Sequence, residues 1–201
     1  MLVPLLAGII YGENVRPFVL CIALSLALGL TLASIKPDST ELFARDGFLA
    51  VGLAWMLMSL LGALPYILSG DIPDFVDALF ESVSGFSTTG ATVLTDVETL
   101  SRSCMLWRLL SQWIGGMGVL VFMLAVMPMS GEHSMHIVRA EFPGPTVGKL
   151  VPRVRETAKI LYLIYIGMTL LAFVLFACGG MSIYEALGHA FASAGTGGFS
   201  T

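Results

Sequence analysis

The run Ser87-Thr88-Thr89-Gly90-Ala91-Thr92 is the part of this sequence best suited to bind an ion. Threonine favours extended backbone, and the glycine at position 90 can take a positive φ. Such a strand can point successive carbonyl oxygens at one axis, where they replace the water shell of a cation. The chemistry indicated is therefore coordination of a dehydrated monovalent cation by backbone oxygens, without any covalent step.

The residues just before this run predict a short helix that carries it. Residues 71–74 supply acidic capping groups and a proline at a helix start, and good helix formers continue to about Ser84. A helix of about 12 residues is ~18 Å long, roughly half a bilayer, so it would enter from one face and stop inside. We expect Gly85 to let the chain leave this helix, whose partly negative C-terminal end favours cations. An acidic outer mouth that raises the local cation concentration would be formed by Asp71, Asp74 and Asp77.

Composition and hydropathy place this loop in a membrane protein. Hydrophobic residues make up 56% of the chain and charged residues 12%, against about 25% charged in soluble domains. Ten basic residues and a net charge of -4 leave no basic stripe for a phosphate backbone, which excludes nucleic acid as a partner. Four uncharged segments are long enough for spanning helices, which need ~20 residues. They are Phe18 to Ile35, Gly47 to Ser69, Leu109 to Met127 and Ile160 to Cys178. We predict an all-α polytopic membrane protein whose non-helical backbone lines an ion path.

Positive charges near the ends of the spans set the expected orientation. Lys36 and Arg45 lie in one connector, and five lysines and arginines lie between 132 and 159. We therefore expect both connectors on the cytoplasmic side, with the loops rich in serine, threonine and glycine opening outward.

The chain contains an internal repeat. The stretch 77–84 matches 185–192 in polarity, and each is followed by a Thr-Gly step, at Thr89-Gly90 and at Thr196-Gly197. The period of about 107 to 110 residues equals a whole helix, loop and helix module, a duplication common in membrane transport proteins. The second copy stops within its loop, so we expect a fragment of a longer protein. The predicted units are 1–35, an N-terminal helix pair with a shortened first helix; 36–157, a first module with its cytoplasmic connector; and 158–201, the start of a second module.

Several stretches resemble the TrkH family, the pore-forming subunits of bacterial Trk potassium-uptake systems within the Trk/Ktr/HKT superfamily. They are VSGFSTTGAT at 83–92, QWIGGMG at 112–118, HAF at 189–191 and TGGFST at 196–201. The connector around Arg139-Ala140-Glu141 and Pro143-Gly144-Pro145 fits the same family.

The resemblance implies helix, re-entrant pore loop and helix modules, similar to those of potassium channels, around one potassium pathway. It implies four modules, of which this chain would hold the first and half of the second. The matching positions give an ion-binding filter of Thr88, Thr89, Gly90, Gly195, Thr196 and Gly197, flanked by Ser87, Ala91 and Gly198. Potassium would be held by the backbone carbonyls of Thr88, Thr89, Gly195 and Thr196. Glycine at the filter positions goes with potassium preference in this superfamily, although Gly195 stands where close relatives are expected to have alanine.

The function implied is potassium uptake by a multi-pass protein of the bacterial cytoplasmic (inner) membrane, with potassium as substrate and no cofactor in this chain. The resemblance further implies a homodimer and a cytoplasmic nucleotide-binding regulatory subunit similar to TrkA. An alternating-access symporter that moves potassium with sodium or protons stays open as the alternative. We expect no enzyme, because the four predicted spans contain no His, Asp, Glu, Lys or Arg.

Two charged or titratable residues have alternative interpretations. Arg108 either pairs with Glu81 or Asp77 and braces the short helix, or extends to the outer interface. His189 occupies the position of Glu81 in the repeat, and we favour a hydrogen-bonded structural histidine over a pH sensor.

Two smaller features are expected to be structural or inert. Close helix packing is favoured over a hinge for the small residues Gly115, Gly116 and Gly118. A metal site is not expected where a fourth ligand is lacking, at Glu132, His133 and His136.

Overall fold

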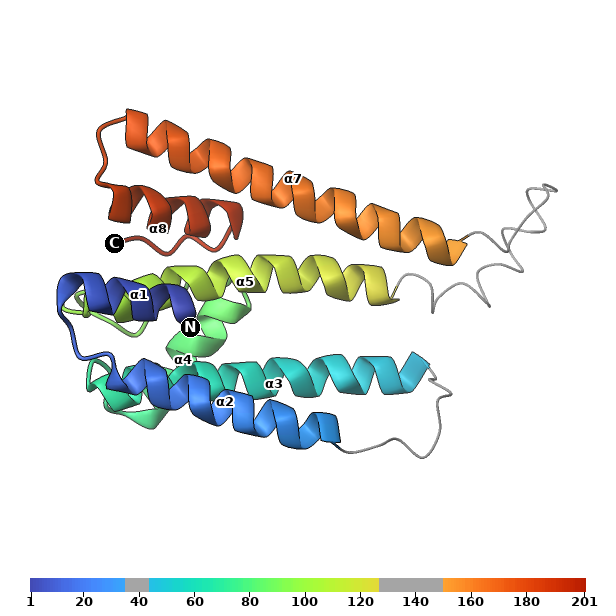
Figure 1. The fold of residues 1–201 in the computed structure, drawn as a ribbon, viewed down its shortest axis with the longest axis horizontal. Coiled ribbons are helices and arrows are strands. Elements are labelled where there is room, and N and C mark those ends of the chain that lie inside the picture. The colour runs from blue at the N-terminus through green and yellow to red at the C-terminus, as the bar shows by residue number, and fades with distance from the viewer. Residues whose placement is uncertain (35–43, 127–149) are drawn as a thin grey trace.

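The computed structural model describes residues 1–34, 44–126 and 150–201, and every regular element in these ranges is an α-helix (Figure 1). The helices are α1 (Leu2–Tyr11), α2 (Arg16–Ser34), α3 (Ala44–Ser69), α4 (Phe75–Phe86), α5 (Arg102–Val126), α7 (Leu150–Cys178) and α8 (Ile183–Ala194). The all-α prediction is confirmed for these ranges.

The four long helices α2, α3, α5 and α7 run side by side, while the short helices α1, α4 and α8 occupy only the left half of the view (Figure 1). Within the described residues, three stretches are long and apolar enough to cross a membrane, namely Arg16–Ser34, Leu49–Ser69 and Lys159–Cys178. The remaining predicted span, 109–127, falls on α5 except for its last residue. The two predicted cytoplasmic connectors, with Glu132, His133 and His136, lie mostly outside the described residues.

The short helices α4 and α8 begin at side-chain caps that the sequence makes visible. The carboxylate of Asp74 accepts hydrogen bonds from the amides of Val76 and Asp77 at 2.8 and 3.1 Å. Ser182 and Glu185 form a reciprocal capping box at the start of α8. Both helices are 12 residues long, or about 18 Å. The half-membrane length predicted for the first of them is therefore matched in both copies.

The N-terminus of α5 is capped by two carboxylates from elsewhere in the chain. Glu13, in the link between α1 and α2, accepts hydrogen bonds from the amides of Arg102 and Ser103 at 2.8 and 3.0 Å. Asp71, which follows α3, accepts from the amide and hydroxyl of Ser101 at 3.2 and 2.5 Å. Negative charge at a helix N-terminus is stabilising. These bonds fix α5 to both neighbouring links and make it the central helix of the fold.

Glycines on α5 let three neighbours approach its backbone. A Cβ at Gly115 would overlap the carbonyl oxygen of Phe86, at the end of α4. A Cβ at Gly116 would lie 2.6 Å from the hydroxyl of Tyr165 on α7, and one at Gly118 would lie 3.2 Å from the ring of Trp55 on α3. The packing interpretation of these glycines is confirmed, because each faces a helix that a larger side chain would displace.

Candidate ion filter

Both short helices are followed by loops that start with the same hydrogen bonds. In each loop the first three residues after the helix donate their amides back to carbonyl oxygens of its last turn, at 2.8 to 3.3 Å. Every donor and acceptor of the first loop has its counterpart 108 residues later. The donor and acceptor pairs are Ser87 to Val83, Thr88 to Gly85 and Thr89 to Ser84 in the first loop, and Gly195 to Phe191, Thr196 to Ser193 and Gly197 to Ala192 in the second.

A matching pair of threonines is held in a conformation that β-branched residues rarely adopt. Thr88 has a φ of 56° and Thr196 a φ of 54°, and two residues later Gly90 and Gly198 have φ values of 75° and 82°. The left-handed region is an outlier for threonine, and each such residue costs on the order of 1–3 kcal/mol. Strain of this kind persists only where the surrounding structure imposes it. The repeat therefore preserves a strained backbone path as well as a residue pattern.

The two loops meet at Gly90 and Gly197. A Cβ at Gly90 would overlap the carbonyl oxygen of Gly197. A Cβ at Gly197 would overlap the side-chain amide of Gln112 on α5, so this helix supports the contact. Thr89 and Thr196 are exposed, whereas Gly197 is buried. The strands that the sequence predicts as the filter thus lie side by side against α5.

The register of the repeat differs by one residue from the sequence pairing of the two Thr-Gly steps. Gly195 is the C-cap of α8, with φ −71° and ψ −9°, and corresponds to Ser87, the C-cap of α4, with φ −75° and ψ −1°. The counterpart of Gly90 is Gly198, which was predicted as a flanking residue. The stretch equivalent to 88–90 is therefore 196–198.

The prediction that Gly85 lets the chain leave the first short helix is wrong. Gly85 lies inside α4, which continues to Phe86, and the chain turns at the left-handed Thr88. A Cβ at Gly85 would overlap the hydroxyl of Ser111 on α5. The glycine is needed for the close approach of two helices, so its role is packing.

A buried ion pair connects α5 to the first loop. Nε of Arg108 donates to Oε1 of Glu81 at 2.5 Å, and the two side chains are 2% and 0% exposed. The hydroxyl of Thr92 lies 3.0 Å from both oxygens of this carboxylate, and the amide of Val93 donates to Oε2 at 3.2 Å. Of the two interpretations of Arg108, the brace is confirmed and the extension to the interface is excluded by burial.

The same arginine also contacts the second loop. Its Nη1 donates to the carbonyl oxygen of Ser200 at 3.2 Å, and its Cζ lies 3.6 Å from the centroid of the Phe199 ring. A guanidinium over an aromatic face is a favourable cation–π contact. Arg108 therefore contacts the segment after the second candidate filter strand directly, and the segment after the first one through Glu81.

In the second copy a hydrogen bond of a histidine takes the place of this ion pair. His189 stands at the repeat position of Glu81, and its Nε2 lies 3.1 Å from the hydroxyl of Thr201, the counterpart of Val93. In both copies the side chain of a residue in the middle of the short helix is therefore hydrogen-bonded to the residue twelve positions later. The hydrogen-bonded interpretation of His189 is confirmed.

Two of the three carboxylates predicted for the outer mouth act as helix caps. Asp71 binds the start of α5 and Asp74 the start of α4, as described above. Asp77 lies exposed in the first turn of α4, where a negative charge favours the helix dipole.

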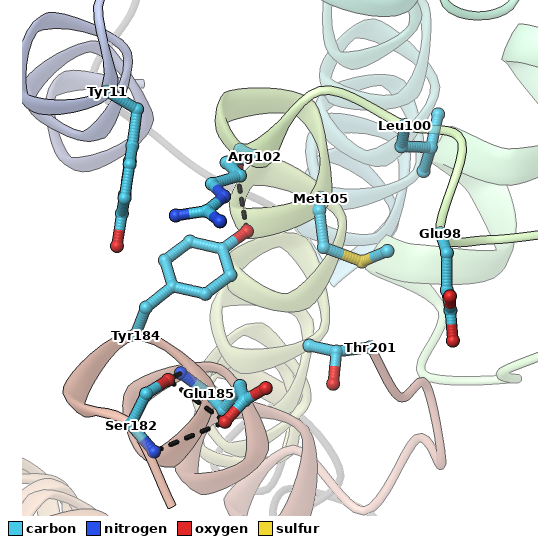
Figure 2. Close-up of a pocket in the computed structure, with 9 residues that line it drawn as sticks. All are labelled: Tyr11, Glu98, Leu100, Arg102, Met105, Ser182, Tyr184, Glu185 and Thr201. Carbon is cyan, nitrogen blue, oxygen red and sulfur yellow. Dashed lines mark hydrogen bonds between the residues drawn. The ribbon is translucent and has the colours of Figure 1, made fainter.

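An open pocket of about 660 Å³ lies beside the end of the second loop, near the N-termini of α5 and α8 (Figure 2). The Tyr184 hydroxyl donates to the carbonyl oxygen of Arg102 at 2.7 Å, and burial raises the pKa of this phenol, which keeps it a donor. The guanidinium of Arg102 lies 4.2 Å from the centroid of the Tyr11 ring. The pocket is lined by Tyr11, Glu98, Leu100, Arg102, Met105, Ser182, Tyr184, Glu185 and Thr201. Glu98 and Glu185 thus line the same pocket as Thr201, the last residue of the second loop described here.

A family model described as TrkH, cation transport protein, matches residues 13–201. The chain is 40% identical over 206 residues to the Trk system potassium uptake protein TrkH of Escherichia coli K12. It is 34% identical over 205 residues to the Trk system potassium uptake protein TrkG of the same strain. Each alignment covers 100% of this chain but 42% of the relative, so the chain spans less than half the length of these proteins.

A solved structure has the same arrangement of helices. The crystal structure of the potassium transporter TrkH from Vibrio parahaemolyticus matches with a TM-score of 0.82 at 34% identity, covering 99% of this chain and 40% of that one.

Proposed function

Because this chain belongs to the TrkH family of cation transport proteins, we propose that it forms part of a potassium-uptake protein of the bacterial cytoplasmic membrane. Potassium passes a filter made of backbone carbonyl oxygens, to which the two loops described here contribute two strands. The relatives are more than twice as long as this chain, and the remaining strands come from the rest of such a protein.

The observation that carries the proposal is the alternation of φ along both strands. Thr88 and Gly90 have positive φ while Thr89 between them does not, and the same holds for Thr196, Gly197 and Gly198. Alternation of this kind turns successive carbonyl oxygens toward the same side of a strand, as a row of cation ligands requires. The proposed ligands are the carbonyls of Thr88 and Thr89. In the second loop they are those of Thr196 and Gly197, the counterparts in the register of the structure, in place of the predicted Gly195 and Thr196.

The short helices add to the preference for cations. Each ends at its loop, so the partly negative ends of α4 and α8 lie beside the strands. The buried charge nearest the strands is balanced within the Arg108 and Glu81 pair. Selectivity between cations therefore depends on backbone geometry.

The drive for uptake is the membrane potential, which is worth ~2.3 kcal/mol per charge per 100 mV. We further propose that the protein passes the membrane several times with its connectors in the cytoplasm, forms a homodimer, and binds a TrkA-like nucleotide-binding subunit on its inner face. The support is the family membership and the lysines and arginines of the connectors.

The test is rubidium uptake by the full-length protein in cells that lack other potassium import, with sodium as competitor. Gly90→Ser should reduce discrimination against sodium, because its Cβ would overlap the carbonyl oxygen of Gly197. Gly70→Ser is the matched control, since Gly70 also has a positive φ, of 85°, but has open space around it. We expect Gly70→Ser to discriminate like the wild type. Absence of rubidium uptake by the wild type, or equal discrimination in both variants, would contradict the proposal.

A further inference from the structure

We propose that Gln112 is a positioning residue that sets the distance between the two filter strands, and with it the preference for potassium over sodium. The inference rests on the potassium-uptake function proposed above. Gln112 lies on α5, one turn after Arg108, within the stretch QWIGGMG that the filter itself does not use.

The first observation is the complete burial of a polar side chain. Gln112 is 0% exposed and is among the largest side chains with no solvent contact. Its Oε1 accepts a hydrogen bond from the amide of Phe199 at 3.2 Å. One end of the amide group is thus fixed to the backbone that follows the second strand.

The second observation is the position of the other end of the amide group. Nε2 lies 3.5 Å from the place that a Cβ of Gly90 would take, and the amide occupies the place of a Cβ at Gly197. The amide therefore fills the space where the two strands meet. Within the described residues, Nε2 is buried without a hydrogen-bond partner.

A role in simple packing does not explain this arrangement. A leucine or methionine fills a similar volume without the penalty of burying a donor, which is large when the donor stays unpaired. The planar amide is instead held at Oε1 by the amide of Phe199, and this fixes Nε2 in the space between Gly90 and Gly197. Small changes of spacing in a ring of carbonyls alter the ligand field that an ion experiences. Gln112 therefore holds the two strands at a defined separation.

The experiment compares three variants of the full-length protein in cells that lack other potassium import. Gln112→Leu removes both polar ends, and Gln112→Glu keeps the acceptor for Phe199 but replaces the donor. Thr169→Val is the matched control, because it deletes a partly buried hydrogen bond between α5 and α7, from Trp113 to Thr169 at 3.0 Å, that involves no residue of either strand. The readouts are rubidium uptake, the inhibition constant of sodium for that uptake, and the amount of protein in the membrane by immunoblot.

We expect the inhibition constant of sodium to fall about five- to tenfold in Gln112→Leu, the effect of losing roughly one hydrogen bond. It should fall less in Gln112→Glu and stay unchanged in Thr169→Val. An unchanged constant in every Gln112 variant that reaches the membrane would refute the role of Gln112 and leave the proposed function intact. Loss of both variants from the membrane would assign Gln112 to folding and refute the role as well. Absence of rubidium uptake by the wild type would refute the function instead.

Discussion

Replacing Arg108 with methionine should strongly destabilise the protein, because the change leaves the carboxylate of Glu81 buried without its partner. Breaking a buried ion pair from one side costs about 3–5 kcal/mol. The contact with the Phe199 ring adds up to about 2 kcal/mol when desolvated. Thr92 and Val93 continue to donate to the carboxylate, which offsets part of this loss. We therefore expect Arg108→Met to lower the free energy of unfolding by about 3–5 kcal/mol.

The assay is unfolding of the purified full-length protein by sodium dodecyl sulfate in mixed micelles, followed by tryptophan fluorescence. Glu81→Gln and the double variant complete a cycle, and the double variant should cost about 1–3 kcal/mol less than the sum of the single ones. Arg102→Met is the matched control, since this arginine of the same helix is exposed and its guanidinium lies over the rings of Tyr11 and Tyr184, at 4.2 and 6.0 Å. It should cost no more than about 1 kcal/mol.

Additive single effects, within about 0.5 kcal/mol, would refute the reasoning. They would mean that Arg108 and Glu81 contribute independently and that their close contact carries no coupling. A loss of unfolding free energy in Arg102→Met as large as in Arg108→Met would also refute the reasoning, because the contribution of an arginine to stability would then not depend on its burial.

Two further predictions use the same unfolding assay. Gly115→Ala should lower the free energy of unfolding by about 1–3 kcal/mol, because its Cβ would overlap the carbonyl oxygen of Phe86. Gly167→Ala is the control and should be neutral or stabilising, because Gly167 has open space around it. Equal losses of stability in the two variants would exclude close packing as the cause. Thr88→Gly should raise the free energy of unfolding by about 1 kcal/mol, because glycine adopts a φ of 56° without the penalty of a branched side chain. A loss of stability would instead show that the threonine side chain supports its own conformation.

Much of the fold could be predicted from the sequence because the decisive residues act locally. Asp74 and Ser182 cap their helices through neighbouring amides, and the uncharged runs define the long helices. The pairing of Arg108 with Glu81 was foreseen only as one of two possibilities. Nothing in the linear pattern of apolar residues tells whether an arginine near a helix end is buried or reaches the membrane surface.

The register of the two candidate filter strands could not be predicted from residue identity. The second loop contains three glycines close together, so a Thr-Gly step can be matched to the first loop in more than one way. The structure fixes the register through the hydrogen bonds of the last helical turn, which depend on helix length. Counting from the caps would have given it, because Thr88 and Thr196 follow Asp74 and Ser182 at equal distances. The helical location of Gly85 was missed for a related reason, because only the tertiary contact with Ser111 explains a glycine there.

The two copies of the module are related in backbone but are no longer interchangeable. A glutamate in one short helix and a histidine in the other bind different partners, and the guanidinium that belongs to the first copy supports the chain of the second. A protein assembled from two first copies would lack Phe199 and Ser200, the two residues of the second loop that Arg108 contacts. Divergence after duplication has therefore made the second loop depend on an arginine of the first copy, and the two copies share a backbone plan while differing in the side chains that support it.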